Sequence, residues 1–496
     1  MGFISELEKT HNKAFTENGD VSYLHITKAG NCKHNLEFFG LGGAMRNRKL
    51  GAKDLFGMAF KENEKIAMKN LFYLRDCRGG KGERELFRIC LQYLAEICGG
   101  KIRKILPYVI EYGRGDDLLI LVDDLRTRKE TCDFIKEQME TDLEKLDKGE
   151  NVSLLAKWLP KPNATSDYKR RIARIIAEGT GMCEKDYRKR ISALRKSFNL
   201  LETALTEQKY DFEYDKLPSQ AMMKHTGYGS FFAKERKNAF LRNDEKRFRE
   251  YLEGVFKGKR KMNVQTLAPY QVFNKVFSSG EAAEAQWITL KKRIPETAER
   301  IIVVRDGSGS MCGRPNEIAT SLAILASESL TGEFKDKFIT FSEIPRLVDL
   351  SGAASLVDKI RIANLHADCE NTNIEAVYDL ILKISLRCRP EDYISKVVVI
   401  SDMQFDCGAS YDESTFDTAR RKFKEAGILL PVMTYWNVNA RNISFPSDRI
   451  DGVQFVSGYS DAIYMSILKS GNVNAVELME KTLKPYEKVA ESWGIE

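Results

Sequence analysis

The feature that most constrains the fold is an alternation, in the last two hundred residues, between short β-branched runs and amphipathic stretches. Residues 301–304 (IIVV) and 396–400 (KVVVI) have the pattern of strands buried on both faces. The pattern also predicts strands at 337–341, 347–350, 428–435 and 453–456, and helices at 317–330, 374–386 and 416–425. Strands that alternate with helices predict a parallel, doubly wound α/β sheet.

Polar side chains follow the two most apolar runs. Asp306, Ser308 and Ser310 come after the first run, and Asp402 comes after the second. Thr372 stands at the start of the helix predicted at 374–386. Ligands of such sheets bind at the carboxyl ends of the strands. Two carboxylates and three hydroxyls are hard oxygen ligands, so we expect a site for Mg²⁺ or Mn²⁺. The alternative is that both aspartates only cap helices or turns.

This arrangement resembles the metal-ion-dependent adhesion site of von Willebrand factor A (vWA) domains. The resemblance rests on D-x-S-x-S after a buried strand, a Thr about sixty residues later and an Asp about thirty further on. It implies a Rossmann-like vWA domain at residues 299–496. It also implies that water or an acidic residue of a protein partner completes the octahedron around the ion.

The first three hundred residues read as a succession of helices. Apolar residues recur at three- and four-residue spacing, and short joints that contain Gly or Pro separate the stretches. The pattern predicts a HEAT-like α-solenoid or ring built from antiparallel helix pairs. The segment KKRIPETAER precedes the first buried strand, and we place the domain boundary there, after residues 1–298.

Charge is distributed unevenly along the chain. The net charge is +7, but residues 301–496 carry 21 basic and 28 acidic residues. Residues 151–200 are the most basic stretch, with 12 basic and 4 acidic residues. A basic segment that few acids interrupt favours contact with the phosphates of a nucleic acid over an ordinary solvated surface.

Two predicted helices, 167–178 and 185–202, place their basic residues away from an apolar face. On this basis the candidate RNA-binding residues are Lys157, Lys161, Lys169, Arg170, Arg171, Arg174, Lys185, Arg188, Lys189, Arg195 and Lys196. In the first helix, Tyr168, Ile172, Ile175 and Ile176 are expected to point inward. The turn RDCRGGKGER lacks the G-K-[ST] ending of a phosphate-binding loop, and we read it as a joint between helices.

Several stretches resemble a family of Ro-like proteins that join a TROVE-like helical module to a C-terminal vWA domain. They are FFGLGGAMR (38–46), FYLRDCRGGKGERELFR (72–88), AKWLPKPN (156–163), DYRKRISALRK (186–196), YDKLPSQAMMK (214–224) and the run at 247–272. The resemblance implies a helical ring, closed by the vWA domain, that binds small structured or misfolded RNAs on its outer surface and single-stranded RNA ends in its central hole.

Three functions are compatible with these features. The first is a non-enzymatic ribonucleoprotein component that binds RNA. The second is a metal-dependent scaffold that binds a protein and no RNA. The third, a Mg²⁺-dependent nuclease or phosphatase, needs an activator of the nucleophile or a second metal. Because one carboxylate-and-hydroxyl site is visible, we expect no enzymatic activity.

Other residues indicate the cellular compartment and whether further metal or catalytic sites are expected. The chain begins without the features of a signal peptide, and it has no apolar stretch long enough to span a bilayer. Its ten cysteines form no C-x-x-C pair, so we expect reduced thiols in a cytoplasmic protein without a zinc site. The five histidines have no spacing typical of a metal site or a catalytic triad.

Overall fold

The computed structural model describes residues 7, 10–198, 201–226, 239–341, 344–365, 371–408 and 413–494. These residues belong to two compact units. Unit 1 consists of Met1–Asn63 and Tyr214–Lys484, and unit 2 consists of Glu64–Glu213 and Pro485–Glu496. The N-terminal half of the chain is mainly helical, and the C-terminal part contains a six-stranded sheet with helices between its strands. The sheet lies in unit 1.

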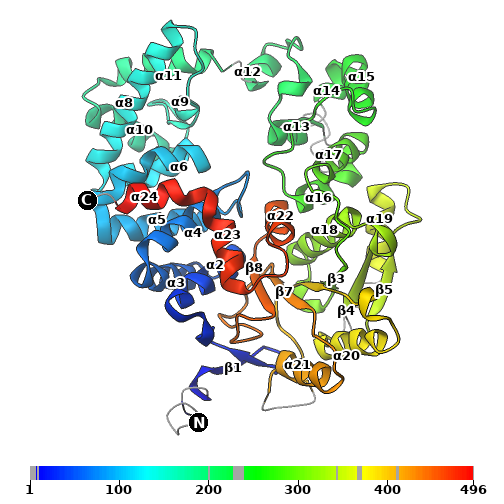
Figure 1. The fold of residues 1–496 in the computed structure, drawn as a ribbon. Helices are drawn as coiled ribbons and strands as arrows, with labels where there is room; N and C mark the ends of the chain where they lie inside the picture. The colour runs from blue at the N-terminus through cyan, green and yellow to red at the C-terminus, as the bar shows by residue number, and fades with distance from the viewer. Residues whose placement is uncertain are drawn as a thin grey trace. The chain divides into compact units, whose positions relative to one another are not determined.

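The sheet has the strand order β5-β4-β3-β6-β7-β8. Its edge strands, β5 and β8, are labelled in Figure 1. Counted along the chain, the strand order is 3-2-1-4-5-6, the order of doubly wound α/β folds. All neighbours pair in parallel except β4 and β5, so the sheet is mixed. The bounds are β3 (Ile301–Asp306), β4 (Lys337–Phe341), β5 (Arg346–Asp349), β6 (Lys396–Ser401), β7 (Val432–Asn437) and β8 (Val453–Ser457).

The strand predictions are confirmed, with one shift and one change of direction. Every residue of β3 and β6 is buried, as their β-branched runs predict. Strand β7 begins at Val432 rather than 428, directly after Pro431, which has no N–H to give to a ladder. The predicted sheet was parallel, but β5 pairs antiparallel with β4, and it is mostly exposed at the edge of the sheet. Only four residues separate the two strands in the sequence, too few for the crossover that a parallel pair needs.

Helices from both ends of unit 1 cover the sheet. Helix α18 (Arg314–Ser329) packs on β3, β4 and β6, and α2 (Lys33–Leu41) packs on β7 and β8. Between or after the strands come α19 (Leu356–Leu365), α20 (Ile374–Ser385), α21 (Thr415–Glu425), α22 (Asp461–Ser470) and α23 (Ala475–Leu483). Before α2 a hairpin of β1 (Lys13–Phe15) and β2 (Val21–Tyr23) joins the unit, and α3 (Lys49–Glu62) packs on α2.

The helices before the sheet also belong to unit 1. They are α13 (Ser219–Thr226), α14 (Ala239–Asn243), α15 (Glu245–Phe256), α16 (Pro269–Ser279) and α17 (Glu281–Lys291). Helix α16 packs on α18, and Trp287 of α17 donates from Nε1 to the buried Glu328 at 2.9 Å. The predicted boundary after residue 298 therefore does not separate the two compact units, because these helices share a core with the sheet.

Unit 2 is helical in the residues that the structure describes. Its helices are α4 (Glu64–Arg75), α5 (Glu85–Cys98), α6 (Leu106–Tyr112), α7 (Leu119–Asp123), α8 (Arg128–Asp147), α9 (Leu155–Trp158), α10 (Asp167–Gly179), α11 (Glu184–Lys196), α12 (Leu201–Thr206) and α24 (Glu487–Gly494). The helix predicted at 185–202 is divided between α11 and α12, and residues 199–200 lie outside the described residues. The C-terminal α24 packs on α4, where Trp493 donates from Nε1 to Glu64 at 2.7 Å.

The sharing of a core by α17 and the sheet can be tested by mutation. We expect Trp287→Ala to lower the free energy of unfolding of unit 1 by about 3–5 kcal/mol, since it removes a buried indole and leaves Glu328 short of a donor. Hydrogen exchange measured by mass spectrometry should be faster in β3 and β6. Phe277→Ala, at an exposed position on α16, is the control and should change stability by less than about 0.5 kcal/mol. Unchanged exchange in β3 and β6 of Trp287→Ala would contradict a shared core.

Candidate functional site

The pairing of β3 with β6 brings the two predicted aspartates to one edge of the sheet. Arg305 of β3 lies opposite Ile400 of β6. Asp306, the last residue of β3, and Asp402, directly after β6, therefore lie at the same carboxyl edge of the sheet. The strand order reverses between these two strands, and doubly wound sheets bind their ligands at such a switch point. The sequence-predicted position of the site is therefore the position where a ligand site is expected in this topology.

Asp306 is fully buried and oriented by two hydrogen bonds. Its Oδ1 accepts from the backbone N–H of Ser308 at 2.9 Å, and its Oδ2 accepts from the hydroxyl of Ser401 at 2.5 Å. Burial nevertheless raises the pKa of Asp306 above its usual value. The hydroxyls of Ser308 and Ser310 lie 3.0 Å apart in the loop that follows. The first three predicted ligands thus form one cluster of oxygens.

Asp402 is equally buried and less well satisfied. Its Oδ1 accepts from the backbone N–H of Gln404 at 3.3 Å, whereas its buried Oδ2 has no hydrogen-bond partner among the described residues. Burial and the nearby charge of Asp306 raise the pKa of Asp402 to about 6, and the Ser310 hydroxyl lowers it by a smaller amount. Two adjacent buried carboxylates with too few donors form an electrostatic arrangement that a cation would stabilise.

The loop after β6 has an unusual backbone. Met403, directly after Asp402, has φ +63°, a left-handed conformation that a residue with a side chain rarely adopts. Its N–H donates to the hydroxyl of Ser401 at 2.9 Å, the same hydroxyl that donates to Asp306. Strained backbone of this kind is concentrated at ligand-binding sites, where the surrounding contacts hold it.

Thr372 lies on an adjoining loop, one residue before the N-cap of α20. It is buried, and its Oγ1 accepts from Asn18 at 3.3 Å. Asn18 also donates to the backbone carbonyl of Gln404 at 2.8 Å, and the Thr372 N–H donates to Asp406 at 2.5 Å. The segment before β2 therefore links Thr372 to the loop that carries Asp402. Sequence reasoning missed Asn18, Gln404 and Asp406, because their contacts join segments far apart in the chain.

The donor set fits a divalent cation that prefers oxygen. The groups at this edge are carboxylates and hydroxyls, and one carboxylate oxygen is buried without a partner. The neighbouring Arg305 is also buried, and its guanidinium donates to the carbonyl of Ala363 and to Asn316. Hard oxygen ligands of this kind are typical of Mg²⁺ and Mn²⁺ sites.

The predicted basic residues of unit 2 divide into two groups. In the first group the cations already have partners within the protein. Arg171 pairs with Asp123 at 2.6 Å, Arg174 pairs with Glu184 at 3.2 Å, and Arg170 contacts Asp167 and two backbone carbonyls. Arg195 is half-buried and donates to the carbonyls of residues 156, 157 and 159, and burial lowers its pKa. Its expected exposure on an outer basic face is wrong, because it supports the loop after α9.

In the second group, the cations have no protein partner among the described residues. They are Lys161, Lys169, Lys185, Arg188, Lys189 and Lys196, of which the last four are exposed along α11. Lys157 differs from both groups, since its ammonium lies 5.6 Å from the ring centre of Trp158. Cations without acidic partners are the ones whose charge is available to an external anion.

Several of these residues line a pocket of about 710 Å³ in unit 2. Its walls include Lys157, Lys161, Lys169 and Arg195 together with the aromatic rings of Trp158 and Tyr168. The Arg114 guanidinium lies 4.0 Å from the ring centre of Trp158, and Tyr168 is 41% exposed rather than directed inward as predicted. Tyr168 also borders a second hollow of about 530 Å³, lined by Arg170, Arg171 and Arg174. Basic and aromatic groups thus share one surface.

Within the described ranges, no helix combines the length and the apolar character that a membrane span needs.

Two families match parts of the chain. Residues 300–492 match the family described as "Domain of unknown function (DUF7788)", and residues 178–302 match "Domain of unknown function (DUF2828)". Among solved structures, the Ro (RSR) protein of Deinococcus radiodurans is similar at 13% identity and a TM-score of 0.40, with 89% of this chain and 92% of that chain covered.

A viral protein is similar along nearly the whole chain. "Uncharacterized protein L728" of Acanthamoeba polyphaga mimivirus is 30% identical over 511 residues. The similarity covers 96% of this chain and 88% of the viral protein, so it includes both compact units. This chain therefore belongs to the same family as protein L728 of the mimivirus.

Proposed function

We propose that this protein is a non-enzymatic, cytoplasmic RNA-binding protein of Ro-like type. In this proposal unit 2 binds RNA, and a vWA-type metal site in unit 1 binds a protein partner. The observation that carries the proposal is the pocket of unit 2, where lysines without partners lie beside the exposed ring of Tyr168. Single-stranded nucleic acid is bound by this combination, because cations meet the phosphates and aromatic rings stack on the bases.

The charge distribution within unit 2 supports a local RNA surface. Residues 151–200 carry 12 basic and 4 acidic residues, whereas the rest of unit 2 carries more acidic than basic residues. Positive charge is therefore concentrated on α9, α10, α11 and the loops between them. The cations without partners, Lys161 and Lys169 at the pocket and those along α11, are the first candidates for phosphate contact. The paired Arg170, Arg171 and Arg174 are candidates only if RNA displaces their acidic partners.

The oxygen site of unit 1 supports a separate, metal-dependent function. Asp306, Ser308, Ser310, Thr372 and Asp402 would hold the Mg²⁺ or Mn²⁺, and the ion would offer an open position to an acidic side chain of a partner protein. Ser401 would keep Asp306 oriented, and the Asn18 and Gln404 contacts would keep Thr372 near the loop of Asp402. The buried, unpartnered Oδ2 of Asp402 is the observation that favours a bound cation.

The RNA proposal leads to a charge-reversal experiment. We expect Lys161→Glu/Lys169→Glu to weaken binding of single-stranded and small structured RNAs. The slope of log K against log salt should flatten by about 1.4–1.8, since each lost phosphate contact contributes about 0.7–0.9. Tyr168→Ala should weaken binding by about 1–3 kcal/mol per stacked base with little change in that slope. Filter binding at several salt concentrations measures both effects.

The matched control for this experiment is Lys136→Glu/Lys148→Glu. Both lysines are exposed in unit 2 and lie outside the basic stretch. This control should bind RNA nearly like the wild type. If both double variants bind RNA like the wild type, the basic surface is only solvated, and the metal-dependent scaffold becomes the favoured function. Mg²⁺-dependent cleavage of the RNA that is lost in Asp306→Ala would instead establish the nuclease alternative.

The metal proposal leads to a thermal experiment. Mg²⁺ at a hundredfold excess over its Kd should stabilise the wild type by about 2.7 kcal/mol, because it binds only the folded state. Asp402→Asn should lose this stabilisation. Without Mg²⁺ the same variant should be at least as stable as the wild type, since it removes a buried carboxylate that is short of donors. Asp451→Asn, at an exposed position in unit 1, should respond to Mg²⁺ like the wild type. An equal Mg²⁺ response in all three proteins would exclude the assigned ligands.

A further inference from the structure

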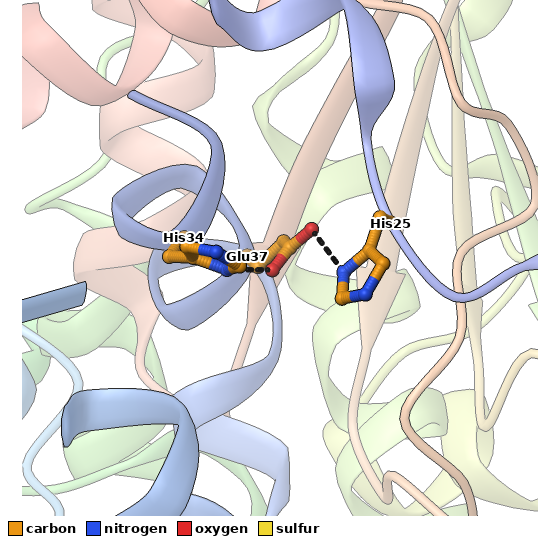
Figure 2. A group of neighbouring side chains, drawn as sticks. All are labelled: His25, His34 and Glu37. Atoms are coloured by element: carbon orange, nitrogen blue, oxygen red, sulfur yellow. Dashed lines mark hydrogen bonds and ion pairs between the residues drawn. The ribbon is translucent and has the colours of Figure 1, made fainter. Parts of the chain in front are cut away.

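Two histidines and a glutamate converge at the N-terminal end of α2. His25 Nδ1 lies 3.0 Å from Glu37 Oε1, and His34 Nδ1 lies 2.9 Å from Glu37 Oε2 (Figure 2). The two imidazole rings are nearly perpendicular, with ring centres 5.8 Å apart. Among the described residues, these three are the one group of three or more His, Cys, Asp and Glu side chains that could share a metal ion, with one ligand atom of each within 4.8 Å of the others.

The backbone around this cluster is fixed by other polar groups. The N–H and carbonyl of His25 both bond the side chain of Asn12 at 2.9 Å. The N–H of His34 donates to Glu62 at 3.0 Å, and the N–H of Ile26 donates to Glu37 Oε1 at 3.2 Å. These bonds hold the segment after β2 and the first turn of α2 in place. The imidazoles are therefore positioned by the fold before any ligand binds, which reduces the ordering cost of binding.

Burial differs among the three side chains in a way that suits an ion. Glu37 is 1% exposed, whereas the side chains of His25 and His34 are 39% and 25% exposed. The carboxylate supplies negative charge where water is excluded, and the partly exposed imidazoles leave a path from solvent. In the absence of an ion, Nδ1–H groups of the histidines can donate to Glu37, and this bonding alone would satisfy the carboxylate. A metal ion would take the place of those two protons.

The ligand types and separations select the class of ion. Two imidazole nitrogens and one carboxylate oxygen are typical ligands of Zn²⁺, Ni²⁺ or Co²⁺ rather than Mg²⁺. In a tetrahedral site with bonds of about 2.0–2.1 Å, neighbouring ligand atoms lie about 3.3 Å apart. The observed separations of 2.9 and 3.0 Å join the two imidazoles to different oxygens of Glu37, and one ligand atom of each side chain lies within 4.8 Å of the others. Side-chain rotations would bring these atoms to the tetrahedral separation.

We propose that His25, His34 and Glu37 bind one transition-metal ion of the Zn²⁺ class. Water would occupy the remaining position. The ion would tie the segment after β2 to α2, the helix that covers β7 and β8. This site is separate from the oxygen site at Asp306, and the proposal does not depend on RNA binding or on Mg²⁺. It revises the expectation of a chain without a zinc site, because the spacing of His25 and His34 along the chain does not reveal that both contact Glu37.

The test uses untagged, chelator-treated full-length protein in millimolar Mg²⁺, so that Mg²⁺ competes with Co²⁺ and Zn²⁺ for the oxygen ligands around Asp306 and Asp402. Co²⁺ is titrated by its visible absorbance, and Zn²⁺ is counted by elemental analysis after gel filtration. We expect one ion per chain and a higher melting temperature with Zn²⁺. His25→Gln and His34→Gln should each weaken binding at least about tenfold, and Glu37→Gln should do the same. His11→Gln, an exposed histidine of the same unit, is the matched control and should bind like the wild type.

Circular dichroism must show that the variants are folded, and His25→Gln, with the more exposed side chain, is the one least expected to disturb packing. Asp306→Ala should keep its Co²⁺ absorbance, which separates this site from the oxygen site. Failure of wild-type protein to bind Co²⁺ or Zn²⁺ would overturn the proposal and leave Glu37 as a hydrogen-bond acceptor only. Wild-type affinity in folded His25→Gln and His34→Gln would overturn it equally.

Discussion

The structure of unit 1 depends on the pairing of β3 with β6. Both strands are buried along their whole length, so their two faces must be covered by other elements. Helix α18 packs on β3 and β6, α2 packs on the neighbouring β7 and β8, and α16 and α17 pack on α18. The same pairing places Asp306 and Asp402 at one edge. Packing and site are thus consequences of one parallel strand pair.

The energetics of that edge explain why a cation is the natural ligand. Two buried carboxylates close together are unfavourable, because each loses hydration and each repels the other. The pKa values of both are raised, and one oxygen of Asp402 has no donor among the described residues. A protein tolerates such an arrangement where it serves a site. The left-handed backbone of Met403, in the loop after Asp402, is a second unfavourable contribution to the folding free energy at this edge of the sheet.

Much of unit 1 could be predicted from the sequence, and the reasons are local. A window of about ten residues contains both the β-branched run of each strand, β3 or β6, and the polar residues directly after it. Such a pattern can be recognised without knowing any contact between distant segments. The features of unit 1 that the sequence does not predict depend on contacts between distant segments. Neither the hairpin β1–β2 nor α2 carries a pattern that shows it belongs to the same compact unit as the sheet. Asn18 contacts Thr372 across more than three hundred residues, and no local signal marks it.

The basic surface shows the same limit in another form. Helical periodicity correctly placed Ile172 and Ile176 of α10 inward and Arg171 and Arg174 outward. It could not show that Arg171 has Asp123 as a partner, or that Arg195 is used to hold three carbonyls. The charge left for a ligand is set by such pairings, not by the count of lysines and arginines. Lys161 and Lys169, beside Tyr168, have no acidic partner among the described residues, so their charge is available to a ligand.

We propose that RNA binds to this basic and aromatic surface of unit 2. Ultraviolet crosslinking of the full-length protein to RNA, followed by mass spectrometry of the crosslinked peptides, locates the contact directly. We expect crosslinks in peptides that contain Trp158 and Tyr168 and in those of α11, and we expect high salt to remove them. Crosslinks confined to unit 1, or no RNA crosslink at low salt, would contradict it.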